Sequence, residues 1–477
     1  MTLKEKARGF MLEFATNRMA ELVSRGDPDK NLRRIIKWGE RITSDPLWVD
    51  AINGFKYRLE INHPLIEIAR RFLKDFNPNV RRRLLTNLIV KEALVGADKR
   101  HKIEDRLGFY PPTLMVISPT MRCNIQCTGC YAFKYPKKDE MPAELIDRIF
   151  TEAKEMGIHF IVISGGEPLF HPDVMDLVEK HGDIAFQMYT NGTLIDEAMA
   201  KRIAKTGNLI PCISLEGLRE ETDRRRGEGV FAKAAEAFDA MRREGVCFGF
   251  SATCTRYNLD AITSPEFIDF VERKGCTLGW YFTYIPIGKD PDTALMPTPK
   301  QRYTLGARIR RIRETRTVFV ADFWNDGPHV DGCIMGGKRY FHVNVHGDVE
   351  PCVFAQFTVD NVRDKPLVEC LRSPFFREFR ARQPFSKDLR RPCAIIDNPA
   401  VLRDCVRLGG ARPSYADNAK LTTELAGDLD AYAATLAAEV DNYSRELDAD
   451  PYRDFGEVEQ SGWVPPSKVA AQTSAAR

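Results

Sequence analysis

The sequence predicts an α/β protein whose central part is a partial (β/α)6 barrel of the TIM-like kind. Six short apolar runs alternate with longer amphipathic segments between Thr113 and Thr315, and Pro111-Pro112 separates this array from a helical region before it. Units of strand then helix in series favour a parallel sheet with right-handed crossovers, and six units are too few to close an eight-stranded barrel. We expect four parts: a helical N-terminal region (1–110), the barrel (111–317), a small domain (318–412), and a C-terminal helix with a disordered tail (413–477).

The N-terminal region is predicted to be helical because apolar residues recur along one face of Asn31–Ile42 and of Val80–Val95. Residues 1–110 carry 23 Lys and Arg against 15 Asp and Glu, whereas the whole chain has a net charge of only +3. The local surplus is either a solvated face or a surface for an anionic membrane or an acidic partner. The overall charge gives no reason to expect nucleic acid.

The expected strands of the barrel are the apolar runs 114–118, 160–164, 185–189, 210–214, 248–253 and 280–285. Helices are expected at 143–156, 172–180, 197–206, 231–244, 265–274 and 299–315. Chemistry in such folds lies at the C-terminal ends of the strands, where the loops that lead into the helices gather.

The alternation is expected to stop near Val318. Tyr340–Val345 and Val349–Phe354 then predict a β-hairpin whose turn is His346-Gly347. The last part begins with an Ala- and Leu-rich helix, Leu421–Glu439, and is expected to be disordered beyond about Pro465.

The chain has 12 cysteines, no apolar run of membrane-spanning length and no signal-peptide pattern at its start. We therefore expect a cytoplasmic protein in which clustered cysteines bind metal and do not form a disulfide framework.

Cys123, Cys127 and Cys130 form a C-x-x-x-C-x-x-C pattern on the loop that follows the first expected strand. Three thiolates on one short loop can hold three corners of a cubic [4Fe–4S] cluster and leave the fourth iron open to a small molecule. The alternatives are a zinc site or unrelated thiols. Structural zinc prefers four ligands, usually as two C-x-x-C pairs, so this spacing suits zinc poorly.

The loop, together with Gly165-Gly166-Glu167-Pro168 after the second strand, resembles the radical S-adenosylmethionine (radical SAM) family. The resemblance covers roughly Leu114 to Ile287. It implies that the cysteines hold the catalytic cluster and that the GGEP run contacts the amino group of S-adenosylmethionine (SAM). Paired glycines let the backbone approach a ligand closely, and Glu167 would supply an acceptor to the positive amine.

Later strand ends complete the expected SAM site. Asn191 follows the third strand, and the resemblance places ribose contacts at Ser214 and Glu216 after the fourth. It places the SAM carboxylate near Arg226, whose guanidinium can donate two parallel hydrogen bonds to it. One departure from the family pattern is Gly129, where many members carry an aromatic residue; the aromatic here is Tyr131, so an adenine contact would be made differently.

A second cysteine set lies in 318–412. The spacing of this set resembles the opening of a SPASM or Twitch auxiliary-cluster domain. Thirteen residues separate Cys333 from Gly347, and four separate Gly347 from Cys352. A full SPASM domain would continue with a dense four-cysteine run, which is missing here. The resemblance therefore implies one auxiliary [4Fe–4S] cluster held by Cys333, Cys352 and Cys393, with Cys405 as a candidate fourth ligand. The alternative is a zinc site or buried free thiols.

The remaining candidates have structural interpretations. Four further cysteines are expected to be small buried hydrophobes, namely Cys212, Cys247, Cys254 and Cys276. The segment 322–327 (DFWNDG) is either near substrate at the barrel mouth or a turn whose Asp and Asn bond their own backbone. His342 and His346 bracket the hairpin tip and are expected to be structural.

The resemblance implies an enzyme that cleaves SAM reductively to methionine and a 5′-deoxyadenosyl radical, which removes a hydrogen atom from a substrate. The expected substrate is a peptide or protein side chain. A first alternative is a lipid or other small metabolite, with the basic N-terminal region resting on the inner membrane face. A second is a non-catalytic cluster- or zinc-binding scaffold. An electron donor of the flavodoxin or ferredoxin type is the expected partner, and nucleic acid is not.

Overall fold

A nine-stranded sheet forms the centre of the computed structural model, which describes residues 26–42, 46–132, 139–288 and 291–449. Neighbouring strands in the sheet follow the order β7-β6-β5-β4-β3-β2-β1-β8-β9, and β1 to β8 all run parallel. The first seven strands are β1 (Met115–Ile117), β2 (Phe160–Ile163), β3 (Ala185–Thr190), β4 (Leu209–Leu215), β5 (Gly249–Cys254), β6 (Leu278–Thr283) and β7 (Phe319–Asp322). The predicted α/β class and parallel sheet are confirmed.

The alternation continues one strand further than predicted. β7 pairs in parallel with β6, so the expectation that the pattern stops near Val318 is wrong, and the expected boundary between 317 and 318 passes through the sheet. The run is only four residues long, and its first residue, Phe319, is exposed at the outer end of the strand order. No amphipathic helix follows β7 directly, so the sequence there lacks the strand-then-helix alternation that marks the other strands.

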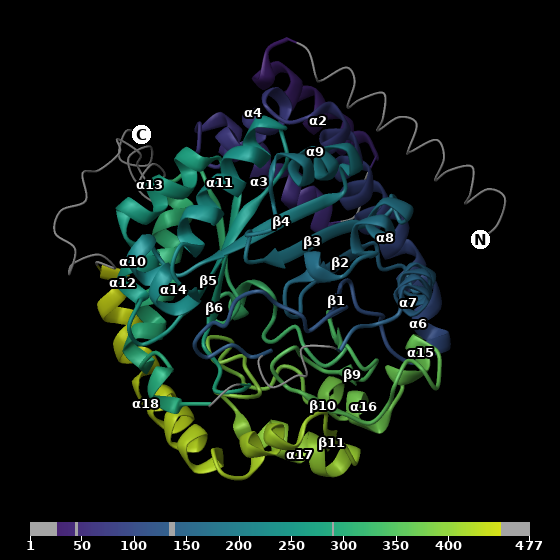
Figure 1. Ribbon diagram of the computed structural model, residues 1–477, viewed down its shortest axis with the longest axis vertical. Coiled ribbons are helices and arrows are strands. Elements are labelled where there is room, and N and C mark those ends of the chain that lie inside the picture. Colours follow the sequence, from purple (N-terminus) through teal and green to yellow (C-terminus); the bar gives the residue numbers. More distant parts are fainter. Residues whose placement is uncertain (1–25, 43–45, 133–138, 289–290, 450–477) are drawn as a thin grey trace, which may run out of the picture.

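Helices cover the outer face of the strands, as Figure 1 shows. They are α7 (Ala143–Glu155), α8 (Val174–Lys180), α9 (Glu197–Thr206), α10 (Arg219–Arg226), α11 (Val230–Arg243), α12 (Leu259–Thr263), α13 (Pro265–Lys274) and α14 (Pro299–Thr315). Capping residues determine where several of these helices begin. Thr298 and Gln301 form a capping box at the start of α14, and Ser264 caps the start of α13. The buried apolar faces of helices and strands pack into one large core.

The N-terminal helices are α2 (Pro28–Ile42), α3 (Pro46–Glu60), α4 (Ile66–Lys74), α5 (Pro78–Leu84), the π-helical η1 (Leu85–Gly96) and α6 (Ala97–Leu107). They contact the loops that enter strands. The Asn87 amide donates to the carbonyl oxygens of Gly182 and Ile184 before β3, and the Asn77 N–H donates to Gly245 before β5. This region therefore covers the end of the barrel opposite the three-cysteine loop. None of the described helices combines the length and apolar character of a membrane span.

The last third of the chain joins the same sheet through the predicted hairpin, β8 (His342–Val343) and β9 (Val349–Glu350). Gly347 turns the chain with φ +88°. A buried network docks the hairpin on β1: His342 shares a 2.7 Å hydrogen bond with Glu350 and a 2.8 Å hydrogen bond with Ser118. The expected structural role of His342 therefore has a physical basis.

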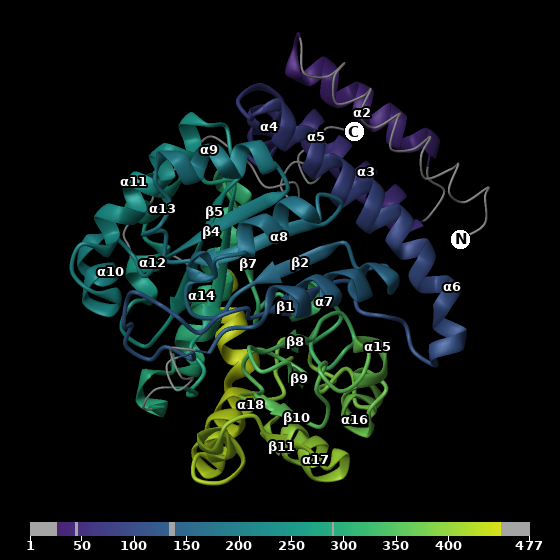
Figure 2. The same ribbon diagram turned by 45° about the vertical axis from the view of Figure 1, so that its right-hand side comes forward.

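The remaining elements are β10 (Phe357–Thr358), α15 (Leu367–Cys370), α16 (Pro374–Ala381), α17 (Pro399–Gly409), β11 (Arg412–Pro413) and α18 (Ala426–Ala449). Figure 2 shows this region below β1, with the N-terminal helices along another side of the sheet. The C-terminal helix begins later and runs further than the predicted Leu421–Glu439. The tail predicted to be disordered beyond Pro465 lies outside the described residues.

Candidate active site

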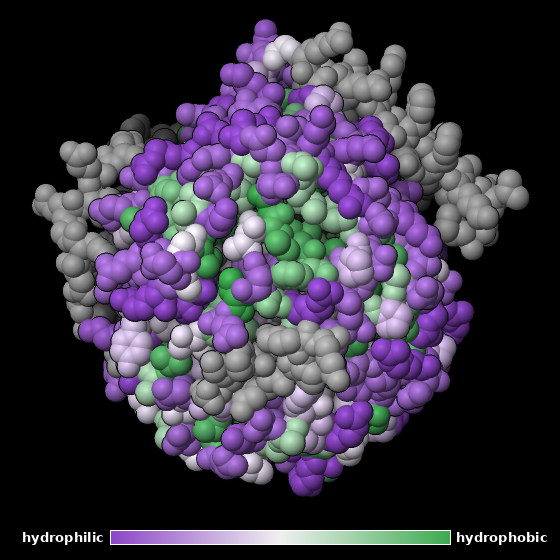
Figure 3. All heavy atoms as spheres, in the orientation of Figure 1, coloured by the Kyte–Doolittle hydropathy of each residue, from purple (hydrophilic) through white to green (hydrophobic). Residues whose placement is uncertain are grey.

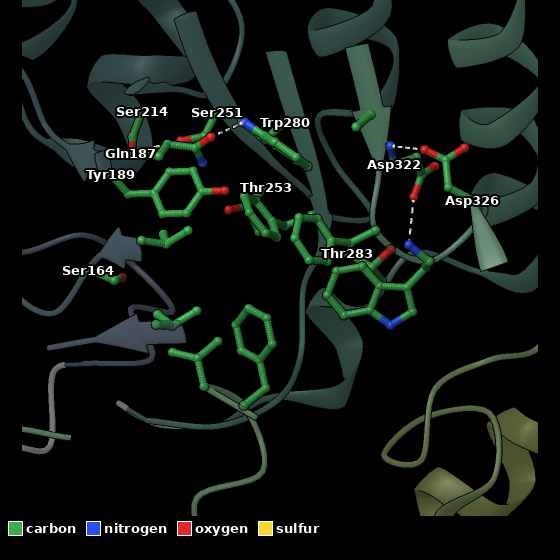
Figure 4. Close-up of a pocket in the computed structure, with 18 of the residues that line it drawn as sticks. Ser164, Gln187, Tyr189, Ser214, Ser251, Thr253, Trp280, Thr283, Asp322 and Asp326 are labelled. Carbon is green, nitrogen blue, oxygen red and sulfur yellow. Dashed lines mark hydrogen bonds between the residues drawn. The ribbon is translucent and has the colours of Figure 1, made fainter. Parts of the chain in front are cut away.

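A cavity of about 870 Å³ runs through the interior of the partial barrel. Both cysteine sets lie on its wall: Cys123, Cys127 and Cys130 from the first, and Cys333, Cys352 and Cys393 from the second. Side chains from several strands line the same cavity, among them Ser214, Ser251 and Thr253, which Figure 4 shows. Hydrophobic residues gather in the middle of the face shown in Figure 3, within a rim of hydrophilic ones.

The three-cysteine loop is held against the end of β2 by backbone contacts that need glycine. The Gly166 N–H donates to Thr120 O at 2.9 Å, and the Glu167 N–H donates to Arg122 O at 2.7 Å. A Cβ atom on Gly165 would lie 2.5 Å from Thr120 O, and one on Gly166 would lie 2.3 Å from Arg122 O. The paired glycines therefore position the cysteine loop, in addition to lining the cavity.

Glu167 does not line the cavity, although the sequence suggested that it would accept from a ligand. It is fully buried, and its carboxylate accepts from the Thr190 hydroxyl at 2.8 Å, the Asn191 N–H at 2.7 Å and the Leu169 N–H at 3.2 Å. Burial raises the pKa of Glu167 to about 7. Through these hydrogen bonds, Glu167 connects the end of β2 to the end of β3. Pro168 is also buried and absent from the cavity wall.

Asn191 and Ser214, which the sequence suggested as SAM contacts, lie on the cavity wall. The Asn191 amide nitrogen is 2.9 Å from Asn124 Oδ1 and 3.9 Å from Cys123 Sγ, so this side chain reaches the cysteine loop. Ser214 shares a 3.0 Å hydrogen bond with Ser251 on the next strand. Asn191 is therefore placed to contact a molecule beside the first cysteine set, and Ser214 lines the same cavity.

Glu216 and Arg226 form one buried ion-pair group. One Glu216 oxygen accepts from Arg226 Nη2 at 2.5 Å, from Arg226 Nε at 2.9 Å and from Arg225 Nη1 at 2.5 Å. The Asn258 amide donates to its other oxygen at 3.3 Å. Glu216 is therefore committed to protein donors and lies off the cavity wall, whereas Arg226 is on the wall with Nη1 at 3.9 Å from Cys127 Sγ. The arginine charge faces the place where anionic sulfur would lie.

Two tyrosines border the first cysteine set. Tyr131 shares a 2.6 Å hydrogen bond with Ser164 at the end of β2. Gly129 has φ +67°, and a Cβ atom there would lie 2.9 Å from the ring of Tyr284, which follows β6. An aromatic ring thus lies beside Gly129 although the residue itself carries none. The sequence could not reveal this contact, because Tyr284 is far from Gly129 along the chain.

Each cysteine of the second set has a hydrogen-bond donor directed at its sulfur. The Tyr340 hydroxyl donates to Cys352 Sγ at 2.7 Å, and the Ile395 N–H donates to Cys393 Sγ at 3.3 Å. Cys333 receives the backbone N–H of Met335. Burial raises the pKa of Cys333 and of Cys352, so bare thiols here are protonated and iron must displace their protons on binding.

Cys405 lies elsewhere. It is buried in α17, is absent from the cavity wall, and its charged neighbours Arg382, Glu378 and Asp404 belong to α17 or to the end of α16. The structure thus brings together three of the four cysteines that the sequence proposed for the auxiliary cluster. The cysteines expected to be buried, Cys212, Cys247, Cys254 and Cys276, are all buried.

Aromatic side chains fill the wall between the two cysteine sets. Phe354 lies 5.8 Å from Tyr131 and 5.8 Å from Trp324 between ring centroids, and Phe282 stacks on Phe323 at 4.9 Å. The DFWNDG segment forms the turn that was one of its two predicted interpretations. Asp322 accepts from the backbone N–H groups of Trp324 and Asn325, and this turn places Phe323 and Trp324 on the cavity wall.

The comparisons with known proteins agree with this arrangement. Residues 117–259 match the model of the radical SAM superfamily, and residues 333–397 match the SPASM iron-sulfur cluster-binding domain. The mycofactocin maturase MftC of Mycobacterium tuberculosis is 30% identical over 302 residues, which cover 58% of this chain and 74% of that protein. The chain belongs to the radical SAM superfamily.

Two further similarities bear on fold and chemistry. An AdoMet-dependent heme synthase of Nitratidesulfovibrio vulgaris is 26% identical over 310 residues, covering 58% of this chain and 83% of that enzyme. The structure of Streptococcus suis SuiB bound to precursor peptide SuiA superposes with a TM-score of 0.52 at 19% identity, over 63% of this chain and 75% of SuiB. At that identity, the likeness to SuiB concerns the fold.

This chain is a radical SAM enzyme that uses SAM, a [4Fe–4S] cluster and auxiliary iron–sulfur chemistry. The donor sets fit such clusters. Each set supplies three thiols on the cavity wall, Cys123, Cys127 and Cys130 in the first and Cys333, Cys352 and Cys393 in the second. A zinc ion needs sulfurs at about 2.3 Å from a single centre, whereas a cubic cluster takes thiolates at separate corners.

Proposed function

We propose that this radical SAM enzyme removes a hydrogen atom from a peptide or protein side chain held in the cavity between the two cysteine sets. When bound, SAM and the first cluster supply the 5′-deoxyadenosyl radical that performs this removal. The observation that carries the proposal is that one cavity is lined by both sets, so that a substrate within it meets SAM chemistry at one end and the auxiliary site at the other.

The residues around the first cysteine set would divide the work as follows. Cys123, Cys127 and Cys130 would hold the cluster. Gly165, Gly166, Asn191, Ser214 and Arg226 would contact SAM, since all five lie on the cavity wall. Glu167, Pro168 and Glu216 would act as positioning residues, because none of them lies on that wall and both carboxylates are committed to protein donors.

The polar side chains of this largely apolar wall favour a peptide over an anionic lipid. Its uncharged polar side chains Ser164, Gln187, Ser251 and Thr253 suit the amide groups of a peptide. Three of its arginines are already paired with carboxylates: Arg225 and Arg226 with Glu216, and Arg313 with Asp326. An anionic headgroup would compete with these carboxylates for the guanidinium groups, so the paired arginines offer it little uncompensated positive charge.

A lipid or other small metabolite is the second candidate, because the cavity extends to Arg58, His63 and Leu65 of the basic N-terminal region. Contact of that region with a membrane surface belongs to this candidate. For either substrate we propose an electron donor of the flavodoxin or ferredoxin type.

The test is anaerobic turnover with the holoenzyme, chemical reductant and SAM. A lipid-free fraction of cellular peptides and proteins should stimulate 5′-deoxyadenosine formation and yield peptides whose masses have changed. A solvent-extracted lipid fraction should not. Stimulation by the lipid fraction alone would replace the peptide proposal with the second candidate, and C123A/C127A/C130A should abolish the reaction in both arms.

A further inference from the structure

The cysteines on the auxiliary side of the cavity share a local geometry. In each case the backbone N–H of the residue two positions later donates to the sulfur: Met335 to Cys333, Phe354 to Cys352 at 3.4 Å, and Ile395 to Cys393 at 3.3 Å. In the first set, Cys123 receives the N–H of Ile125 in the same way. Such donors stabilise the thiolate, which is the form that binds iron.

Cys405 has neither this geometry nor this location. It lies inside α17, where backbone N–H groups are committed to the helix, and it packs toward Arg382 and Glu378. The electrostatic neighbours of Cys333 include Cys352 and Cys393, whereas those of Cys405 include no other cysteine. Cys370, in α15 beside Asp360 and Lys365, is likewise off the cavity wall.

The polar side chains nearest the second set are also committed. Both oxygens of Asp397 bind the guanidinium of Arg302, and one of them also accepts the Cys393 N–H at 2.9 Å. The Tyr340 hydroxyl donates its proton to Cys352 Sγ. These groups support the cysteines, and the second set itself offers three thiols; His329, four residues before Cys333, also lines the cavity but is exposed.

We propose that Cys333, Cys352 and Cys393 are the complete protein ligand set of the auxiliary [4Fe–4S] cluster and that its fourth iron faces the cavity. Three protein thiols would leave one iron of a cubic cluster without a protein ligand, and all three cysteines line the cavity. That iron would take a carboxylate, thiolate, hydroxyl or amine of the bound substrate. The ligand set is independent of the substrate class, whereas the substrate contact rests on the proposed function.

Iron analysis tests the ligand set. In the background C123A/C127A/C130A, only the auxiliary cluster can form, and about four irons per chain are expected. Adding Cys405→Ala should leave that value unchanged, as should the matched buried-thiol control Cys370→Ala, whereas adding Cys352→Ala should abolish the cluster. Cys405→Val gives a second variant if the alanine variant does not fold. Loss of the cluster in folded Cys405 variants, with Cys370→Ala intact, would overturn the assignment.

Electron paramagnetic resonance tests the open iron in the same background, with ¹³C-labelled cyanide as the probe. The reduced cluster should give a changed spectrum with ¹³C hyperfine coupling. An unchanged spectrum would show that the cluster has four protein ligands and would contradict the proposal. Neither the iron analysis nor the spectrum depends on turnover. A failure of the proposed function would appear as wild-type enzyme that no peptide fraction stimulates, and it would therefore be distinguishable from a failure of the ligand assignment.

Discussion

Glu167 is an ionisable group in a place without solvent. Three protein donors favour its charged form, but burial has the larger effect and raises its pKa from 4.5 to about 7. A carboxyl group whose pKa is raised on folding stabilises the native state most when it is protonated. This contribution is complete below about pH 4.5 and is lost as the pH rises through about 7.

The first prediction concerns this titration. The variant Glu167→Gln cannot ionise, so the free energy of unfolding of the wild type should fall relative to the variant by about 3 kcal/mol between pH 4.5 and pH 8. Anaerobic thermal unfolding of both proteins across this range checks it. A difference in midpoint that stays constant with pH would show that Glu167 does not titrate in this window.

The second prediction concerns Gly166, whose added Cβ would meet Arg122 O at 2.3 Å. Because a backbone atom cannot move aside as a flexible side chain can, Gly166→Ala should displace the cysteine loop and cost about 1–3 kcal/mol. Iron content should fall toward that of the auxiliary cluster alone. The control is Gly427→Ala in α18, where a Cβ meets nothing within 4 Å; it should retain all iron.

At single residues, the sequence located the chemistry but not every partner. Asn191, Ser214 and Arg226, which their positions after strands suggested as SAM contacts, lie on the cavity wall. The same reasoning could not show that Glu167 and Glu216 turn inward to neighbouring strands and helices, because position after a strand does not determine which way a side chain points. The spacing of the cysteines along the chain also could not show that Cys393 lies in a loop whereas Cys405 lies inside a helix.

Among elements, the link between α14 and the loop after Cys393 is the most consequential. Arg302 and Asp397 are both fully buried, and Asp397 also accepts the backbone N–H of Cys393. This ion pair therefore connects the last barrel helix to an auxiliary ligand. A buried pair is costly to break from one side, because the remaining charge is left without compensation.

The third prediction follows. Arg302→Met should destabilise the protein by about 3–5 kcal/mol and reduce the auxiliary iron, since Asp397 would no longer be held. The double variant Arg302→Met with Asp397→Leu should recover part of the stability but not the Cys393 contact. Arg403→Met, which breaks a pair with the half-exposed Asp430, should cost under about 1 kcal/mol. Thermal unfolding and iron analysis give both readouts, and a harmless Arg302→Met would refute the argument.

Elements were predictable where periodicity was long. The helices at Glu197–Thr206, Pro265–Lys274 and Pro299–Thr315 begin and end where the sequence pattern placed them. Short elements were not: α10 and α12 carry too few apolar residues for a clear helical face, and β7 has only four residues. These elements depend on contacts distant in sequence, which a local pattern does not contain.

For the whole molecule, the auxiliary region and the barrel share one sheet. The Val116 N–H donates to Phe341 O and the Ser118 N–H to Val343 O, so β8 occupies one edge of β1. The expected division at 317–318 therefore separates sequence segments but not folded bodies.

The fourth prediction is that a chain ending at Lys338 does not fold as a stable barrel. Removal of β8 and β9 would leave the backbone groups of β1 unpaired along one edge, and such edges associate with other chains. Size-exclusion chromatography should show aggregates. A chain ending at Ala449, which keeps every strand of the sheet, should elute as the full chain does. A monodisperse shorter chain would contradict the argument.

The pairing of Val116 with His342 also determines when, during synthesis of the chain, this edge of the sheet can be paired. One edge of β1 is among the first parts of the barrel to leave the ribosome, yet its partner follows more than two hundred residues later. At roughly 5–20 residues per second, the edge waits on the order of tens of seconds before it can be covered. During that interval the nascent chain has an unpaired strand next to the unmetallated first cysteine set, so chaperone supply and iron delivery should limit its yield.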